Sequence, residues 1–290
     1  MTPRSRRAPA KNSAKTTAKT TPRPLTGFRL AEALIAGWRP LQRLDVDGFA
    51  LLRSRGVTRR ANSALALEAP TADDALNGAI ERVEALYAMA GEPSTFRVLD
   101  MHGPAQLDTV LAERGYESTG HSALLATTLR GARLPDPHPS AEIRTGALDE
   151  DWFEAAWLLA PRDGDQARET MHDILAGTPA VQVLLRAEGD LEGGTGAEPV
   201  AVGRAALVEA GRETVAVLNM IAVDPAHRRR GLGRALSQTL LAIAAVQGAD
   251  RVLLEVEQDN APALALYRGL GFEHLGEYHY RVRTAPSDPT

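Results

Sequence analysis

The stretch Asp224-Pro-Ala-His-Arg-Arg-Arg-Gly-Leu-Gly233 separates the apolar residues 217–223 from residues 231–246, whose apolar positions recur at helical spacing. This order predicts a strand, a turn and a helix that begins at a pair of glycines. The first amides of a helix lack backbone acceptors, and its N-terminus carries partial positive charge, so the junction suits a phosphate anion. Glycine leaves room for a diphosphate to approach the backbone, and the preceding arginines add positive charge.

Two other phosphate-binding patterns do not fit this stretch. A Walker A loop ends in Gly-Lys-Ser/Thr, and here neither the lysine nor the hydroxyl is present. A dinucleotide-binding fingerprint needs a third glycine, where this chain has Leu236. The pattern Arg-x-x-Gly-x-Gly is therefore of another kind, although a basic helix start without a ligand would have the same sequence.

A second informative segment, residues 253–272, reads Leu-Leu-Glu-Val-Glu-Gln-Asp-Asn-Ala-Pro-Ala-Leu-Ala-Leu-Tyr-Arg-Gly-Leu-Gly-Phe. It predicts a strand and then a helix that is capped by Asn260 and ended by glycine. Each feature also has an ordinary structural explanation: Asn260 as a cap, Tyr267 as a core residue and Gly271 as a turn.

Together the two segments resemble the GNAT superfamily of N-acetyltransferases, in the order strand, Arg/Gln-x-x-Gly-x-Gly/Ala, helix, strand, Asn-x-x-Ala-x-x-Leu-Tyr-x-x-x-Gly-Phe. The likeness covers about residues 200–283. Six residues fall at family positions in one register: Asn260, Ala263, Leu266, Tyr267, Gly271 and Phe272. The resemblance implies an α/β fold of the α+β type, in which a mixed, mostly antiparallel sheet is flanked by helices.

The resemblance also implies acetyl-CoA as co-substrate. In the family, the strand before the loop splays from its neighbour and the pantetheine arm lies between the two. The residues that this assigns to the cofactor are Ile221, Ala222, Val223, Arg228, Arg229, Arg230, Gly231, Leu232, Gly233, Arg234 and Asn260.

For catalysis, an amine must be neutral to attack a thioester, and the departing thiolate benefits from a proton, so an acid and a base are expected. Tyr267 matches the family's acid, and its spacing from Glu255 resembles the acid and base of bacterial ribosomal-protein N-terminal acetyltransferases. Other members carry an acid on the strand before the loop. Here that strand offers only Asn219, which would require a water relay. With no cysteine in the chain, direct transfer in a ternary complex is expected, with oxyanion help from an amide near Ile221.

The first half of the chain follows a similar order of elements. We expect strands at 48–53, 57–67, 95–99 and 116–129, a helix capped by Thr71 and ended by Gly91, and a helix at 104–114. The first helix begins with two aspartates and no glycine pair, and Leu111 stands where Tyr267 would be. We interpret this half as a degenerate GNAT-like domain that does not bind CoA, similar to tandem GNAT proteins such as mycothiol synthase.

The second half begins after a proline-rich linker at 130–139. We expect strands at 142–144, 181–186, 200–209, 214–223, 251–256 and 273–283, and helices at 149–159, 166–175, 231–246 and 261–270. The predicted organisation is a disordered basic tail (1–25), the degenerate domain (26–134) and the acetyl-CoA-binding domain (140–290). Residues 58–63 are polar and either face the interdomain cleft or form a solvated strand face. Arg162, Asp163 and His172, in the helical region, are further candidates for the acceptor site.

Charge is divided unevenly along the chain. Seven of the 33 basic residues and every lysine lie in residues 1–25, which hold no acid, so 26 basic residues face 37 acidic ones in the remainder. A solvated extension, a nucleic-acid contact and a transit-like segment all fit such a tail. No apolar run reaches the length of a membrane span, and we expect a cytoplasmic protein without a metal site and without a nucleic-acid or membrane partner.

The acceptor is left open by the sequence. A polyamine-like or aminoglycoside-like amine would suit an acidic cleft, and a protein N-terminus would suit the Glu255 and Tyr267 pairing; a homodimer is also left open. The main alternative to an enzyme is a non-catalytic acyl-CoA sensor, which the missing acid at Asn219 would favour.

Overall fold

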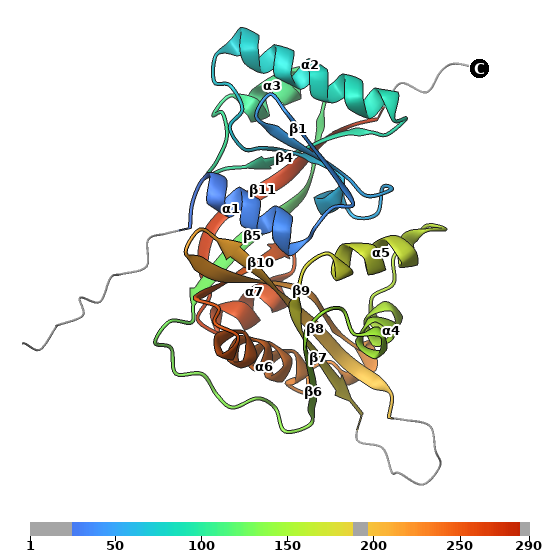
Figure 1. Cartoon of the computed structure of the whole chain (residues 1–290), viewed down its shortest axis with the longest axis vertical. Coiled ribbons are helices and arrows are strands. Elements are labelled where there is room, and N and C mark those ends of the chain that lie inside the picture. The colour runs from blue at the N-terminus through green and yellow to red at the C-terminus, as the bar shows by residue number, and fades with distance from the viewer. Residues whose placement is uncertain (1–24, 188–196, 285–290) are drawn as a thin grey trace, which may run out of the picture.

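A computed structural model describes residues 25–187 and 197–284 (Figure 1). The basic tail predicted for residues 1–25 therefore lies outside the described residues except for Leu25. Between the strands expected at 181–186 and 200–209, the sequence also predicts a turn at Gly193, Gly194 and Gly196, which lies outside the described residues as well.

The first half of the chain supplies five strands and three α-helices among the described residues. In chain order they are α1 (Phe28–Gly37), β1 (Gln42–Val46), β2 (Phe49–Arg53), η1 (Arg59–Ala61), β3 (Ala64–Ala66), α2 (Asp73–Met89), β4 (Ser94–Leu99), α3 (Leu107–Glu113) and β5 (Glu117–Thr128). The second half follows with β6 (Ala141–Gly146), α4 (Glu150–Leu159), α5 (Ala167–Ala176), β7 (Ala180–Arg186), β8 (Pro199–Ala210), β9 (Glu213–Val223), η2 (Pro225–His227), α6 (Leu232–Val246), β10 (Arg251–Glu257), α7 (Ala261–Arg268) and β11 (Glu273–Arg283).

All eleven strands form one mixed sheet in the order β1-β2-β3-β4-β11-β5-β10-β9-β8-β7-β6. The pairs β3 with β4 and β9 with β10 are parallel, and the remaining pairs are antiparallel. The mostly antiparallel mixed sheet with flanking helices confirms the predicted fold class.

The two halves exchange strands at the centre of this sheet. β5, from the first half, pairs with β10 through Arg251↔Thr128 to Glu257↔Ser122, and β11, from the second half, pairs with β4 through Tyr278↔Leu99 to Arg283↔Ser94. β5 and β11 also pair with each other. Figure 1 shows this crossing in the middle of the molecule. Each half thus completes its sheet with a strand of the other.

Alternate residues of the strands face different helices, as the period of two requires. On β9, Leu218 packs in the cluster that contains Leu236 and Leu240 of α6, whereas Val217 packs in the cluster that contains Leu30 and Leu34 of α1. α1 therefore belongs to the first half of the sequence but covers the sheet of the second half.

Some sequence expectations differ from the structure. No element was predicted over α1 and β1. The strand predicted at 57–67 is instead a loop and a 3-10 turn before the three residues of β3, because Arg55 and Thr58 have positive φ values of 52° and 62°. Thr71 does not cap α2, whose N-cap is Ala72, without a side-chain hydrogen bond. The other strands and helices agree with the predicted ranges to within a few residues.

A buried arginine joins α1, α5 and the sheet. Arg204 on β8 is 1% exposed and donates to the carbonyls of Leu175 (2.8 Å), Thr178 (2.6 Å) and Gly37 (3.5 Å) and to Asn219 Oδ1 (3.3 Å). Two of these carbonyls, on Gly37 and Leu175, belong to the last turns of α1 and α5, where the helix dipole favours a cation. Burial lowers the pKa of Arg204 to about 10.

The docking of α1 on β9 gives a stability prediction with a matched control. A Cβ on Gly37 would lie 2.5 Å from Val217 Cβ, whereas on Gly78 of α2 the nearest atom, the end of the Arg82 side chain, is 3.4 Å away. We expect Gly37→Ala to lower the free energy of unfolding by about 1–3 kcal/mol through overpacking. Gly78→Ala should raise it by about 0.4–1 kcal/mol. Urea unfolding measures both, and an unchanged Gly37→Ala variant would contradict the docking of α1.

The strand exchange gives a second prediction. A protease recognition site inserted between Asp136 and Pro137, in the segment without helix or strand that follows β5, should allow cleavage into two fragments. Because β5 pairs with strands of the other half on both sides, the fragments should elute together in size-exclusion chromatography and separate only in urea. Fragments that separate in native buffer would show that the halves do not share strands.

Candidate functional site

β9 and β10 diverge at the centre of the sheet. Their parallel pairing runs from Val215↔Arg251 to Leu218↔Leu254 and stops there, although β9 continues to Val223 and β10 to Glu257. A bulge interrupts β9 at the same point: Met220 has a φ of 52°, and the register with β8 shifts between Val202 and Arg204. The ends of these strands therefore leave backbone groups of β9 without a partner on β10.

The loop after β9 turns sharply into α6. Asp224 Oδ1 accepts from the Ala226 amide (2.7 Å) and starts η2, and Gly231 in the left-handed region (φ 82°) is the N-cap of α6. Within residues 25–187 and 197–284, no backbone carbonyl accepts a hydrogen bond from the amides of Arg229, Arg230 or Gly231. A Cβ on Gly231 would meet open space. The start of α6 thus presents donors to an open surface, as the sequence leads one to expect of an anion site.

The residues assigned to the cofactor occupy three kinds of position. Ile221, Val223, Gly233 and Asn260 line a cavity of about 700 Å³ between the ends of β9 and β10. Ala222 and Leu232 pack against hydrophobic clusters on the two faces of the sheet. Of the arginines, Arg228 and Arg234 donate to the Val223 (3.2 Å) and Gly269 (3.2 Å) carbonyls, and Arg229 and Arg230 are exposed in the loop.

Asn260 and Tyr267 are both held by α7. Asn260 Oδ1 accepts from the Ala263 amide (3.1 Å), so the predicted cap is present, and Asn260 also lines the cavity. Tyr267 is 3% exposed, and its ring packs edge-on against Phe272 at 5.5 Å. Burial raises the pKa of Tyr267 to about 12, against the opposing effect of a hydrogen bond with Ser237. The phenol therefore stays protonated at neutral pH.

Glu255 lines the same cavity as Tyr267, but two arginines of the first half already contact it. Its side chain is 3% exposed, Oε2 accepts from Arg60 Nη1 (3.0 Å), and Oε1 accepts from Arg97 Nη2. Arg97 belongs to β4, which the strand exchange brings beside β11. Glu255 is thus the counter-ion of two guanidinium groups, a role that the sequence did not indicate.

The first half contributes to the lining of this cavity through Thr58, Arg59 and Arg60, which lie in the segment 54–62. Asn62 organises this segment: its side chain accepts from the Ser54 (2.7 Å) and Gly56 (3.0 Å) amides and donates to the Val57 and Thr58 carbonyls (both 2.7 Å). The fold of this loop places Arg60 over the Trp38 ring, 4.3 Å from its centroid. A solvated strand face was the other interpretation of this segment, and the structure excludes it.

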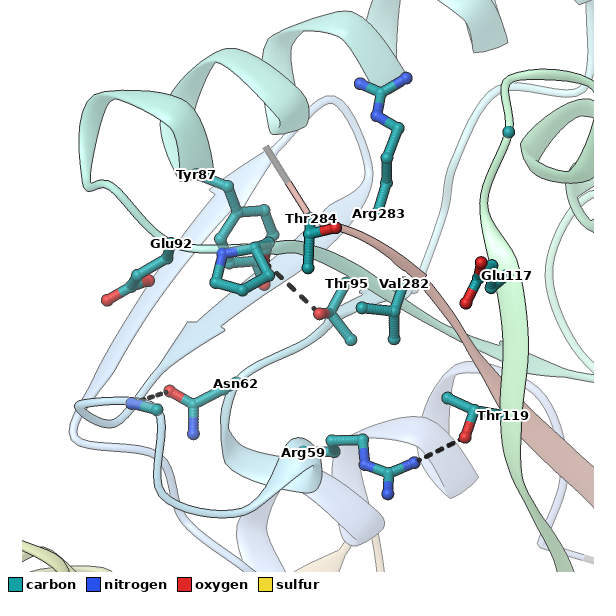
Figure 2. A pocket seen from close by; sticks show the side chains of 13 residues that line it. Arg59, Asn62, Tyr87, Glu92, Thr95, Glu117, Thr119, Val282, Arg283 and Thr284 are labelled. Atoms are coloured by element: carbon teal, nitrogen blue, oxygen red, sulfur yellow. Dashed lines mark hydrogen bonds between the residues drawn. The ribbon is translucent and has the colours of Figure 1, made fainter. Parts of the chain in front are cut away.

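Arg59, in the same loop, lies between two cavities. It lines the cavity of Tyr267 and also a neighbouring cavity of about 650 Å³, which Figure 2 shows from close by. In Figure 2, Arg59 donates to Thr119 of β5 (3.3 Å), and Asn62 accepts from the Gly56 amide. The guanidinium also lies 5.6 Å from the centroid of the Tyr280 ring.

Tyr278 is a cavity residue that the sequence did not single out. It lies on β11, and the Arg97 guanidinium stacks 3.9 Å from the centroid of its ring. Burial opposes ionisation of this phenol, but the positive charges of Arg97 and Arg60 outweigh that effect and lower the pKa of Tyr278. The contact with Arg97 distinguishes Tyr278 from an ordinary strand tyrosine, and that contact depends on the exchange of strands.

The other residues that were weighed for the acceptor site separate into two groups. Arg162 lines the cavity, whereas His172 contacts Glu150 (2.9 Å) and the Phe153 ring and is not part of the lining, nor is Asp163. Asn219 also lines the cavity, but its side chain donates to the Gly37 (3.2 Å) and Val217 (3.1 Å) carbonyls.

Neither a group of metal-ligating side chains nor a membrane-spanning helix is found among the described residues. In these parts of the chain no three or more His, Asp or Glu side chains are grouped as metal ligands would be. No helix there has the length and apolar composition needed to cross a membrane.

Comparisons with known proteins identify a family and several relatives. The sequence profile of one family, described as the C-terminal region of the probable histone acetyltransferase Rv0428c, matches residues 28–284. The uncharacterized N-acetyltransferase YobR of Bacillus subtilis is 25% identical over 251 residues, which are 86% of this chain and 95% of that protein. A mycothiol acetyltransferase of Clavibacter michiganensis is 38% identical over 146 residues, 49% of this chain and 36% of that protein.

Solved structures share the fold over most of the chain. A GCN5-related N-acetyltransferase from Kribbella flavida superposes with a TM-score of 0.64 at 19% identity and covers 89% of this chain and 96% of its own. A tandem GNAT protein from the clavulanic acid biosynthesis pathway superposes with a TM-score of 0.65 at 15% identity and covers 93% and 92%. The relatives support acetyl transfer as the general class of reaction. This chain belongs to the family of the Rv0428c C-terminal region, within the GNAT superfamily of N-acetyltransferases.

Proposed function

We propose that the chain is an N-acetyltransferase that moves the acetyl group of acetyl-CoA to an amine by direct transfer in a ternary complex. The observation that carries this proposal is the opening between β9 and β10, whose lining includes Gly233 at the start of α6 and Tyr267 of α7. A diphosphate at the start of α6 and a thioester beside Tyr267 match the groups at the two ends of the pantetheine arm of acetyl-CoA.

The unpaired groups of the site suit this co-substrate. The amides of Arg229, Arg230 and Gly231, which have no backbone acceptor among the described residues, would donate to the diphosphate. Arg228, Arg229 and Arg230 add positive charge beside them. The pantetheine arm would then lie along Ile221, Ala222 and Val223, where β9 has no partner on β10.

The proposed reaction joins the amine nitrogen to the thioester carbonyl carbon and breaks the bond between that carbon and sulfur. The CoA thiolate takes a proton from Tyr267, whose raised pKa keeps the phenol protonated until that moment. An amide beside the bulge at Met220 and Ile221 would donate to the oxyanion.

Two side chains are candidates for the group that accepts the proton of the amine. Glu255 was the expected base, and it faces the cavity, but both of its oxygens accept hydrogen bonds from arginines. Tyr278 has a lowered pKa in the same cavity. We therefore propose Glu255 as the positioning residue that holds Arg60 and Arg97, and Tyr278 as the proton acceptor.

The first half, in this proposal, is a GNAT-like unit that does not bind CoA. The helix of this half that corresponds to α6 is α2, which begins with Asp73 and Asp74, and their charges would repel a diphosphate. Leu111 of α3, in the place that corresponds to Tyr267, is fully buried. The domain ranges 26–134 and 140–290 remain our proposal, with β5 and β11 shared between them.

Replacing Tyr267 by Phe separates an enzyme from a CoA sensor. We expect kcat for acetyl transfer to fall by about 10²-fold, because the departing thiolate loses its acid. The affinity for CoA should stay within about twofold, since the phenol contributes to the chemistry rather than to diphosphate binding. Release of CoA thiol and calorimetric titration with CoA measure the two effects. Wild-type turnover in Tyr267→Phe would remove Tyr267 from the mechanism, and a wild-type chain that binds CoA without any turnover would favour the sensor.

The raised pKa of Tyr267 also predicts the shape of the pH profile. An acid must be protonated to act, and a pKa of about 12 keeps Tyr267 protonated far above neutral pH. We expect kcat to rise as the amine loses its proton and then to stay level up to about pH 10. A descending limb near the ordinary tyrosine value of 10.0 that disappears in Tyr267→Phe would show that the phenol is not shifted.

A further inference from the structure

The acceptor end of the cavity has more positive than negative groups. Arg59, Arg60 and Arg162 line it, and Arg97 lies behind Glu255. The only carboxylates in the lining are Glu255 and Glu257. The sequence led us to consider cationic acceptors in an acidic cleft, whereas the lining has the opposite balance of charge.

Glu255 compensates only part of this positive charge. Its single negative charge is shared between Arg60, at 3.0 Å, and Arg97. Arg59 contacts the Thr119 hydroxyl and the Tyr280 ring, both of which are neutral. Guanidinium charge therefore remains available to a ligand at this end.

Arg162 is the clearest example of a guanidinium group whose charge remains available to a ligand. It follows α4, and its guanidinium donates to the Ala160 (3.3 Å) and Pro161 (3.1 Å) carbonyls next to it in sequence. Among the described residues no carboxylate lies within ion-pair distance of Arg162. Partial desolvation, and the positive charge of Arg60, lower the pKa of Arg162, although its side chain stays exposed to solvent. Arg60 and Arg162 thus repel each other across one cavity, and an anion between them would relieve this repulsion.

We propose that the acceptor amine carries a carboxylate or a phosphate, which Arg162 and Arg59 bind while the amine faces the thioester. This inference rests on the proposed acetyl transfer. A guanidinium group can hold either anion through two parallel hydrogen bonds. Polyamines and lysine-rich peptides are poor acceptors in this arrangement, because their additional positive charges would meet Arg59, Arg60 and Arg162.

The test uses pairs of amines that differ in charge. With acetyl-CoA and the full chain, release of CoA thiol is measured for β-alanine against β-alaninamide and for ethanolamine phosphate against ethanolamine. Spermidine serves as the cationic acceptor. We expect kcat/KM to be at least about tenfold higher for the anionic member of one pair, as a charge-assisted hydrogen bond provides. The pair that shows the preference distinguishes a carboxylate from a phosphate.

Variants connect the preference to the arginines. Arg162→Gln should bring the two members of the preferred pair to nearly equal kcat/KM, and Arg162→Lys should keep part of the preference because the charge remains. Arg212→Gln, at the turn between β8 and β9, is the matched control and should behave as the wild type. A higher kcat/KM for the neutral amines or spermidine, or an unchanged preference in Arg162→Gln, would overturn the proposal.

Calorimetry separates this inference from the proposed function. The same anionic amines are titrated into the CoA-saturated chain and into its Arg162→Gln variant. Turnover without a preference for anions would leave acetyl transfer standing and refute the anion site. Binding that depends on Arg162, without turnover of any amine, would support the anion site and refute acetyl transfer to these amines. Neither turnover nor binding of the anionic amines would refute the anion site.

Discussion

The pairing of β5 with β10, and of β11 with β4 and β5, is the constraint on which the rest of the molecule depends. It joins two sequence halves into one eleven-stranded sheet and leaves no boundary between them at the centre. It also determines which side chains meet. Arg97 of β4 meets both Glu255 of β10 and the ring of Tyr278 of β11 only because the strands are exchanged. The cavity is therefore a product of both halves, although only the second has the features of a CoA site.

The two halves contribute different chemistry to this cavity. The second half provides the start of α6, the splayed ends of β9 and β10, and Tyr267, which together suit a thioester co-substrate. The first half provides the loop held by Asn62, with Arg59 and Arg60, and so forms the side that the acceptor would meet. In the proposed function, a half that does not bind CoA would in this way still determine which amine enters.

Local patterns in the sequence were enough to predict the strands and helices that the second half of the chain contributes to the cavity. The strand, the glycine pair and α6 follow one another directly in the chain. Asn260 caps the helix that carries Tyr267, seven residues further on, so periodicity and capping rules predict both helices from the sequence. The side of the cavity that the first half forms could not be predicted from local patterns. The loop at 54–62 depends on positive φ at Arg55 and Thr58 and on four hydrogen bonds of one asparagine, and nothing local marks Arg97 or Tyr278. Those contacts arise from pairing between strands that are far apart in the chain.

The position of β11 in the sheet has a consequence for synthesis of the protein. This strand is translated after every other strand of the sheet, yet it lies between β4 and β5, which are translated early. Until β11 emerges from the ribosome, one edge of β4 has no neighbouring strand, and β5 lacks β11 as well. The backbone groups of the first half at this gap therefore stay unpaired and exposed. Such late closure of a central gap leaves strand edges through which incomplete copies could associate during synthesis.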